Sequence, residues 1–261
     1  MGRNTAIVTG VVIVVLAVVL GFRTGFLGSD DTTLDGNPAA LVGGQAAAAG
    51  GDRGQNATPD SSSRVQAANL ARYEIDPAQS EVYWRVYRAG PAARLGHSHV
   101  ISVGELSGSI GLAAELAQSE WELRIPVAAL IVDDPEIRAR HGAEFESQPS
   151  DDDKAGTKTN MLSDRLLNGE VYQDIRLQGV GFAGTAANAI LPVSIAIVGQ
   201  SLEFSFPAQI VVSGDSITVT GEYQLTHADL GLEPFSAAGG LMRVGDEIDF
   251  TYRLHALAVG R

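Results

Sequence analysis

The chain has 261 residues, 45% of them hydrophobic, a formal net charge of −13 and no cysteine. Residues 1–68 hold four Lys/Arg and five Asp/Glu, so nearly all of the negative charge belongs to the remainder. Such a surface argues against nucleic-acid binding and against docking on anionic lipids through a basic patch, and the missing thiols exclude disulfides, thiolate metal sites and a cysteine nucleophile.

An uncharged apolar run, Ala6 to Phe22, lies near the amino terminus between Arg3 and Arg23. At about 17 residues it reaches the lower limit for a membrane-spanning helix. A cleaved signal peptide is the alternative, although no small-x-small cleavage site follows the run closely. We predict an uncleaved signal anchor over residues 1–23. It would form a single-pass transmembrane helix and place the rest of the chain on the extracytoplasmic side, periplasmic or at the cell surface.

Residues 24–70 are rich in Gly, Ala, Ser and Asp, with segments such as GGQAAAAGGDRGQ. This stretch has too few apolar side chains to offset the entropy lost on folding. We therefore predict a disordered tether here and a single folded domain over residues 71–258.

Apolar and polar residues alternate in many short segments after Arg72. Strict alternation is typical of half-buried antiparallel strands. Thirty glycines and only 6% aromatic residues also favour turn-rich β structure. Seven to nine strands without a long helical pattern indicate a sandwich or a barrel. The candidate strands are Glu81–Arg88, His99–Val103, Glu105–Leu112, Trp121–Pro126, Ile175–Phe182, Ile190–Val198, Ser201–Val212, Ser216–Thr226 and Glu247–His255.

One acidic stretch, from Asp133 to about Val171, interrupts the alternation. We predict a short helix around Thr159–Leu167 and a solvated loop over Ser147–Gly156. The three adjacent carboxylates Asp151–Asp153 in this loop lack the spacing of a calcium site.

Six short motifs follow one another over roughly residues 72–257. They are Tyr73–Val82, Leu106–Ile110, Met161–Ser163, Tyr172–Leu177, Asp229–Leu232 and Gly240–Ile248. In this order they resemble the motifs Y-x-I-D-P-x-x-S-x-V, F-x-G-x-I, L-x-S, Y-P-x-I-x-F, D-F-G-I and L-x-V-x-D-x-V of the YceI-like proteins. The sequence departs from the family pattern at Gln173, where proline is usual, at Leu230, where phenylalanine is usual, and at the two histidines of His97-Ser98-His99.

The resemblance implies an all-β, lipocalin-like antiparallel eight-stranded β-barrel with an extended cavity that binds polyisoprenoid chains. Inward-facing apolar residues would then line the cavity and contact the ligand. A packed core explains the alternation equally well, so the pattern leaves open whether the barrel is hollow. The residues expected to face inward are Val82, Trp84, Val86, Trp121, Leu123, Ile125, Ile175, Leu177, Ile217, Val219, Tyr223, Ile248, Phe250 and Tyr252.

His97 and His99 offer a different function. Residues i and i+2 of a strand share a face, so both imidazoles could bind one metal ion, with His227 or Asp229 as a third ligand. A metal-binding protein or metal-dependent enzyme would follow. The simpler interpretation is a pair of histidines at the edge of a loop that hydrogen-bond to water.

Other catalytic signatures are missing from the sequence: we find no phosphate loop, no nucleophile elbow and no positioned acid–base pair. We therefore expect a non-catalytic protein that needs no cofactor. Its expected partners are an isoprenoid or other long-chain lipid and the membrane reached by its N-terminal helix, with no nucleic acid. Metal binding through His97, His99 and His227 is the alternative.

Overall fold

The computed structural model describes residues 70–260. The predicted anchor Ala6–Phe22 and nearly all of the predicted tether lie outside this part of the chain. Among the residues that are described, no helix combines the length and apolar character needed to cross a membrane.

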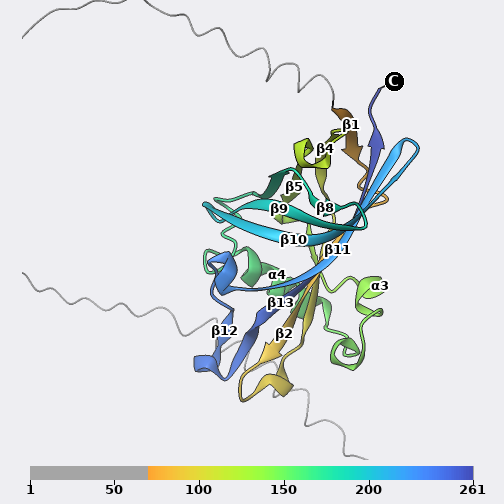
Figure 1. Cartoon of the computed structure of the whole chain (residues 1–261). Coiled ribbons are helices and arrows are strands. Elements are labelled where there is room, and N and C mark those ends of the chain that lie inside the picture. Colours follow the sequence, from red (N-terminus) through yellow and green to blue (C-terminus); the bar gives the residue numbers. More distant parts are fainter. Residues whose placement is uncertain (1–69, 261) are drawn as a thin grey trace, which may run out of the picture. The chain divides into compact units, whose positions relative to one another are not determined.

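Antiparallel strands dominate the described part (Figure 1). Two α-helices, α3 (Pro135–Arg138) and α4 (Asp151–Leu162), lie between the sixth and seventh strands. The strands are β1 (Ala71–Ile75), β2 (Glu81–Ala89), β3 (His99–Val103), β4 (Ser107–Leu112), β5 (Glu120–Pro126), β6 (Leu130–Val132), β7 (Asp174–Val180), β8 (Ala183–Thr185), β9 (Asn188–Ile197), β10 (Gln200–Ser213), β11 (Ser216–Thr226), β12 (Ser236–Ala237) and β13 (Met242–Ala258).

Eight strands close into a barrel in the order β1-β4-β5-β7-β9-β10-β11-β13, and β13 pairs with β1 to complete the ring. The long β13 makes this closure possible: its last residues pair with β1, while its earlier residues pair with β2. Strands β3 and β6 extend the sheet beyond β2. The predicted eight-stranded antiparallel barrel is therefore confirmed. The closed ring and its internal core lie entirely within residues 70–260, so this part of the chain has the core that a domain needs to fold by itself.

Tight turns set the register of the hairpins that form the C-terminal half of the barrel. Gly214 has a φ of 59° in the turn between β10 and β11, and Gly199 has a φ of 73° in the turn between β9 and β10. Glycine adopts this left-handed conformation without the steric cost that a Cβ brings. The register then follows residue by residue, from Ser213 opposite Ser216 to Gln209 opposite Thr220.

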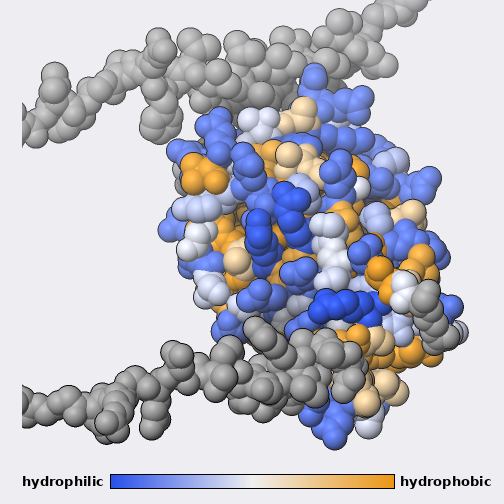
Figure 2. Space-filling view, turned by 90° about the horizontal axis from the view of Figure 1, so that it is seen from above, coloured by the Kyte–Doolittle hydropathy of each residue, from blue (hydrophilic) through white to orange (hydrophobic). Residues whose placement is uncertain are grey.

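The alternation predicted from the sequence separates an apolar interior from a polar exterior. In β9, every second residue from Ala189 to Ile197 is buried, and the residues between them are exposed except Ser194, which is half-buried. On the face seen in Figure 2, apolar residues form separate patches between hydrophilic ones. The apolar side chains of the strands are therefore turned mainly into the barrel, where they form the large buried cluster.

The strand pair β2–β3 departs from this simple pattern because its outer face is also covered. Tyr83, predicted to face outward, is only 7% exposed. It packs with Val100, Ile137 and Phe145 in a second, smaller hydrophobic cluster, with Tyr87 alongside. The segment around α3 covers this face, which period-two alternation alone did not predict.

The predicted positions of the helix and the loop in the acidic stretch were wrong. Helix α4 spans Asp151–Leu162, so it begins inside the segment Ser147–Gly156 that was expected to be a loop. Ser150 caps the helix: its side chain accepts a hydrogen bond from the Asp153 N–H, and the Asp153 side chain accepts one from the Ser150 N–H. This capping box and the acidic first turn stabilise a helix N-terminus, so the acidic run signalled a helix start.

Candidate ligand cavity

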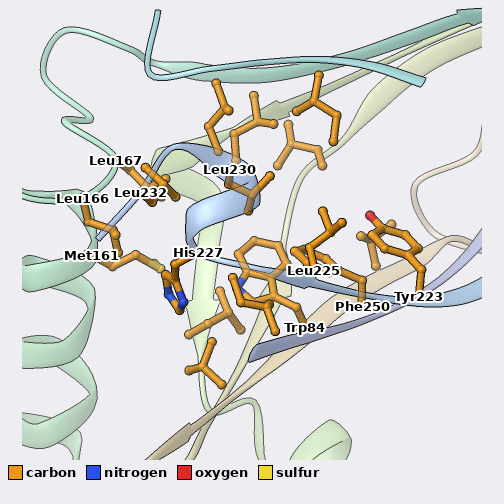
Figure 3. A pocket seen from close by; sticks show the side chains of 18 of the residues that line it. Trp84, Met161, Leu166, Leu167, Tyr223, Leu225, His227, Leu230, Leu232 and Phe250 are labelled. Carbon is orange, nitrogen blue, oxygen red and sulfur yellow. The ribbon is translucent and has the colours of Figure 1, made fainter. Parts of the chain in front are cut away.

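The barrel contains an apolar cavity of about 380 Å³ that is partly open to solvent. The inner faces of the strands form its walls, and side chains from the connecting segments close around one part of it (Figure 3). Met161 of α4, Leu166 and Leu167 contribute from one segment, and Leu230 and Leu232 from another. The sequence analysis missed these residues because they lie outside any alternating strand. The D-L-G-L motif, which matches a motif of the YceI-like proteins, was the sequence feature that could have identified Leu230 and Leu232.

The structure places the residues predicted to face inward on the inner wall. All of them line the cavity except Ile217, which is 1% exposed and belongs to the packed core. Their contact with a ligand stays a prediction. The residues that line the cavity are Val82, Trp84, Val86, Trp121, Leu123, Ile125, Ile175, Leu177, Val219, Tyr223, Ile248, Phe250 and Tyr252.

Aromatic rings form a continuous strip across four neighbouring strands. The ring of Phe206 on β10 stacks on that of Tyr223 at 3.7 Å between centroids, and Tyr223 stacks on Phe250 of β13 at 4.9 Å. Phe250 then meets Trp84 of β2 at 5.8 Å. Such rings provide a large apolar surface with little conformational freedom. They give one wall of the cavity a rigid face.

Gly221 lets another ring lie flat against this wall. A Cβ at Gly221 would lie 2.5 Å from both the Pro207 carbonyl oxygen and the Tyr252 hydroxyl. Tyr252 is the cross-strand partner of Gly221, and its hydroxyl donates a hydrogen bond to the Pro207 carbonyl at 3.1 Å. The glycine therefore supplies the space that the tyrosine ring occupies.

A buried polar network contacts His99, one of the histidines considered as metal ligands. Its Nδ1 lies 2.7 Å from Asp133 Oδ2. The other Asp133 oxygen accepts hydrogen bonds from Arg138 Nη1 at 2.6 Å and from the Val100 N–H at 2.9 Å. Burial by itself would raise the pKa of the Asp133 carboxyl, but the hydrogen bonds from His99 and Val100 and the nearby positive charges hold it below its usual value.

His97, His99 and His227 all line the cavity. The rings of His97 and His99 are 6.3 Å apart, and His97 Nδ1 lies 3.2 Å from the Ser147 hydroxyl. His227 instead uses Nδ1 to donate to the Asp246 carbonyl at 2.9 Å. Within residues 70–260, no group of three or more histidine or carboxylate side chains is arranged to hold a metal ion. No observation here therefore favours the metal alternative.

Two partly buried histidines should make the free energy of unfolding depend on pH. Burial lowers the pKa of His97, and the neighbouring His99 lowers it further. Burial also lowers the pKa of His141, with the charges of Arg85 and Arg140. The unfolded chain therefore takes up these protons at a higher pH than the folded chain, so the free energy of unfolding should fall as the pH drops below about 6.5.

The substitution His141→Phe should make this loss of stability between pH 7 and pH 5 smaller. The ring of His141 packs between those of Tyr83 and Phe145, so phenylalanine suits the site. Urea unfolding at several pH values measures the slope for both proteins. An identical slope in parent and variant would contradict the assignment to His141.

Comparison with known proteins supports the fold. No family model matches the sequence, and no curated protein matches it significantly. The crystal structure of BcnA from Burkholderia cenocepacia is 13% identical and covers 69% of this chain and 98% of its own, with a TM-score of 0.51. A YceI protein from Campylobacter jejuni is 13% identical over 61% of this chain and 85% of its own, with a TM-score of 0.44. The likeness to BcnA confirms the barrel fold that the YceI-like motifs implied.

Proposed function

We propose that this barrel is a non-catalytic carrier that holds an isoprenoid or similar long apolar chain in its interior. The apolar cavity inside the barrel is the observation that carries the proposal. Its volume of about 380 Å³ falls in the range of small-molecule pockets, roughly 300–1,000 Å³. A packed core would have no such space, because protein interiors leave few voids larger than a water molecule.

The chemistry of the walls supports a long hydrocarbon ligand. Apolar side chains line nearly the whole cavity, and the aromatic strip from Phe206 to Trp84 gives one side a rigid surface. Burial of a hydrocarbon chain against such walls is favourable by about 25 cal/mol for each Å² removed from water. A barrel with this interior would shield a lipid from water.

The amino-terminal sequence completes the proposal. The apolar run Ala6–Phe22 would anchor the protein in the membrane, and residues 24–70 would tether the barrel on the extracytoplasmic side. A carrier in that place could take up or deliver a membrane lipid close to the bilayer.

The direct test is native mass spectrometry of purified residues 70–261, with organic extraction and elemental analysis of the same sample. We expect a co-purified lipid, or a saturable complex after a polyprenol is added, with no stoichiometric metal. A protein that shows neither lipid nor polyprenol binding would overturn the proposal, and one zinc or copper ion per chain would favour the metal alternative.

A further inference from the structure

Three histidines line the cavity, and in two of them Nδ1 faces a protein oxygen that can only accept a hydrogen bond, which leaves Nε2 as the free nitrogen. The first such nitrogen is Nε2 of His227, a residue only 4% exposed. Its Nδ1 lies 2.9 Å from the Asp246 carbonyl oxygen, and a carbonyl can only accept a hydrogen bond. The proton of the neutral ring is therefore on Nδ1, which leaves Nε2 as an acceptor. His227 lines the cavity (Figure 3), and none of the residues 70–260 donates to this nitrogen.

The second nitrogen is Nε2 of His99. Asp133, which Arg138 neutralises, accepts the proton of His99 Nδ1 at 2.7 Å and holds the ring in one orientation. The side chain of His99 is 13% exposed and lines the cavity. No hydrogen bond to its Nε2 is found among the described residues. A histidine whose Nδ1–H is held by a buried carboxylate presents a well-oriented Nε2.

The strand register brings these two histidines to the same end of the barrel. His99 pairs with Val86, Val86 with Ile248, and Ile248 with Leu225, so these residues form one row across four strands. His227 follows Leu225 by two residues, about 7 Å farther along the chain. The aromatic row of Tyr223 and Phe250 lies on the opposite side of Leu225. The apolar cavity therefore has one end that carries hydrogen-bond acceptors.

We infer that this end of the cavity recognises the uncharged hydroxyl head of a lipid alcohol, whose single O–H donates to Nε2 of His227, with His99 at the same end of the barrel. The inference rests on the proposed lipid-carrier function and names the chemical class of its ligand. A hydroxyl donates the hydrogen bond that a bare imidazole nitrogen lacks.

The charges near the two histidines favour an uncharged head group. Arg138 is paired with Asp133 at 2.6 Å, and Arg88 with Glu144 at 3.0 Å. Arg243 also lines the cavity but is exposed to solvent, so none of these three cations is both buried and unpaired for a phosphate or carboxylate. Both carboxylates are likewise engaged and unavailable to an ammonium group. Burying an ionic head here without a counter-charge would be costly.

The test compares ligands that differ only in the donor. Geranylgeraniol and its methyl ether share one isoprenoid chain, and hexadecanol and its methyl ether share a saturated chain. Both tryptophans of the protein, Trp84 and Trp121, line the cavity, so intrinsic fluorescence of residues 70–261 reports binding. We expect each alcohol to bind at least about tenfold more tightly than its ether, since an unpaired buried acceptor costs about 1–3 kcal/mol. The tighter of the two alcohols identifies the chain type.

Variants separate the hydrogen bond from the bulk of the added methyl group. His227→Phe keeps a ring but removes the acceptor, so its preference for alcohol over ether should fall to about twofold or less. His227→Gln has an acceptor again and should recover part of that preference. His255→Phe is the matched control, because His255 faces Thr218 and does not line the cavity. Tyr223→Phe tests a second polar group in the cavity, the hydroxyl of the half-buried Tyr223, for which no hydrogen bond is found among residues 70–260.

The outcomes distinguish this inference from the proposed function. If alcohols and ethers bind equally well, or if Tyr223→Phe rather than His227→Phe removes the preference, the histidine site is wrong while the carrier function stands. If no member of either pair binds, the carrier function itself fails. If His227→Phe does not fold, the affinities of the parent protein for each alcohol and its ether still test the inference.

Discussion

Replacement of Val219 by tryptophan should reduce lipid binding on the order of 100-fold while the domain stays folded. Val219 lies on β11, is 4% exposed and lines the cavity. A tryptophan side chain at this position would project into the space proposed for the ligand. If that space is open, the larger side chain replaces ligand contacts and costs the empty barrel little stability. In a filled core the same change would overpack the interior and cost about 1–3 kcal/mol.

The measurement pairs calorimetric titration with a polyprenol against urea unfolding of the lipid-free protein. Thr220→Trp is the matched control: Thr220 is the next residue on β11, is absent from the cavity lining and lies between the outward residues Gln209 and Arg253. It should bind like the parent. If Val219→Trp binds the polyprenol as tightly as the parent, the ligand lies elsewhere. If Val219→Trp is strongly destabilised and the parent itself does not bind, the barrel is filled by its own side chains.

Arg138→Met should lower the free energy of unfolding by about 3–5 kcal/mol, because it leaves a buried charge without its partner. The side chains of Arg138 and Asp133 are both fully buried and meet at 2.6 Å. Arg138 also donates to the Ser98 carbonyl at 2.7 Å and to the Ser147 carbonyl at 2.9 Å. These bonds join β3 to the segment that follows α3, so their loss should loosen the support of His99.

A double-mutant cycle with Asp133→Asn isolates the charge term. Asparagine tolerates the φ of 55° at this position and removes the charge, so the double variant should recover part of the stability. Arg140→Met is the control: its ion pair with Glu81 is about half exposed and should contribute no more than about 1 kcal/mol. Equal losses for Arg138→Met and Arg140→Met in urea unfolding would contradict this account of the buried pair.

The strands and their inner faces followed from the sequence because they depend on local periodicity. An alternation such as that of Glu81–Arg88 reports which side of a strand is apolar whatever its neighbours are. Segment His99–Val103 was predicted with the bounds that β3 has in the structure. The start of α4 was also encoded locally, in the capping box of Ser150 and Asp153, but the run of aspartates was interpreted as a loop.

The hollow interior and the orientation of the histidines depend on tertiary structure. Whether inward side chains fill the barrel is decided by how far apart the opposite walls stand, which no single strand encodes. His99 meets Asp133 across 34 residues of sequence, and His227 meets the Asp246 carbonyl across 19. The sequence by itself indicated which side chains of β2, β5, β7, β11 and β13 face the interior, and all of those predicted except Ile217 line the cavity. The acceptor end of the cavity arose only when the closed sheet brought distant segments together, because hydrogen bonds between them require that proximity.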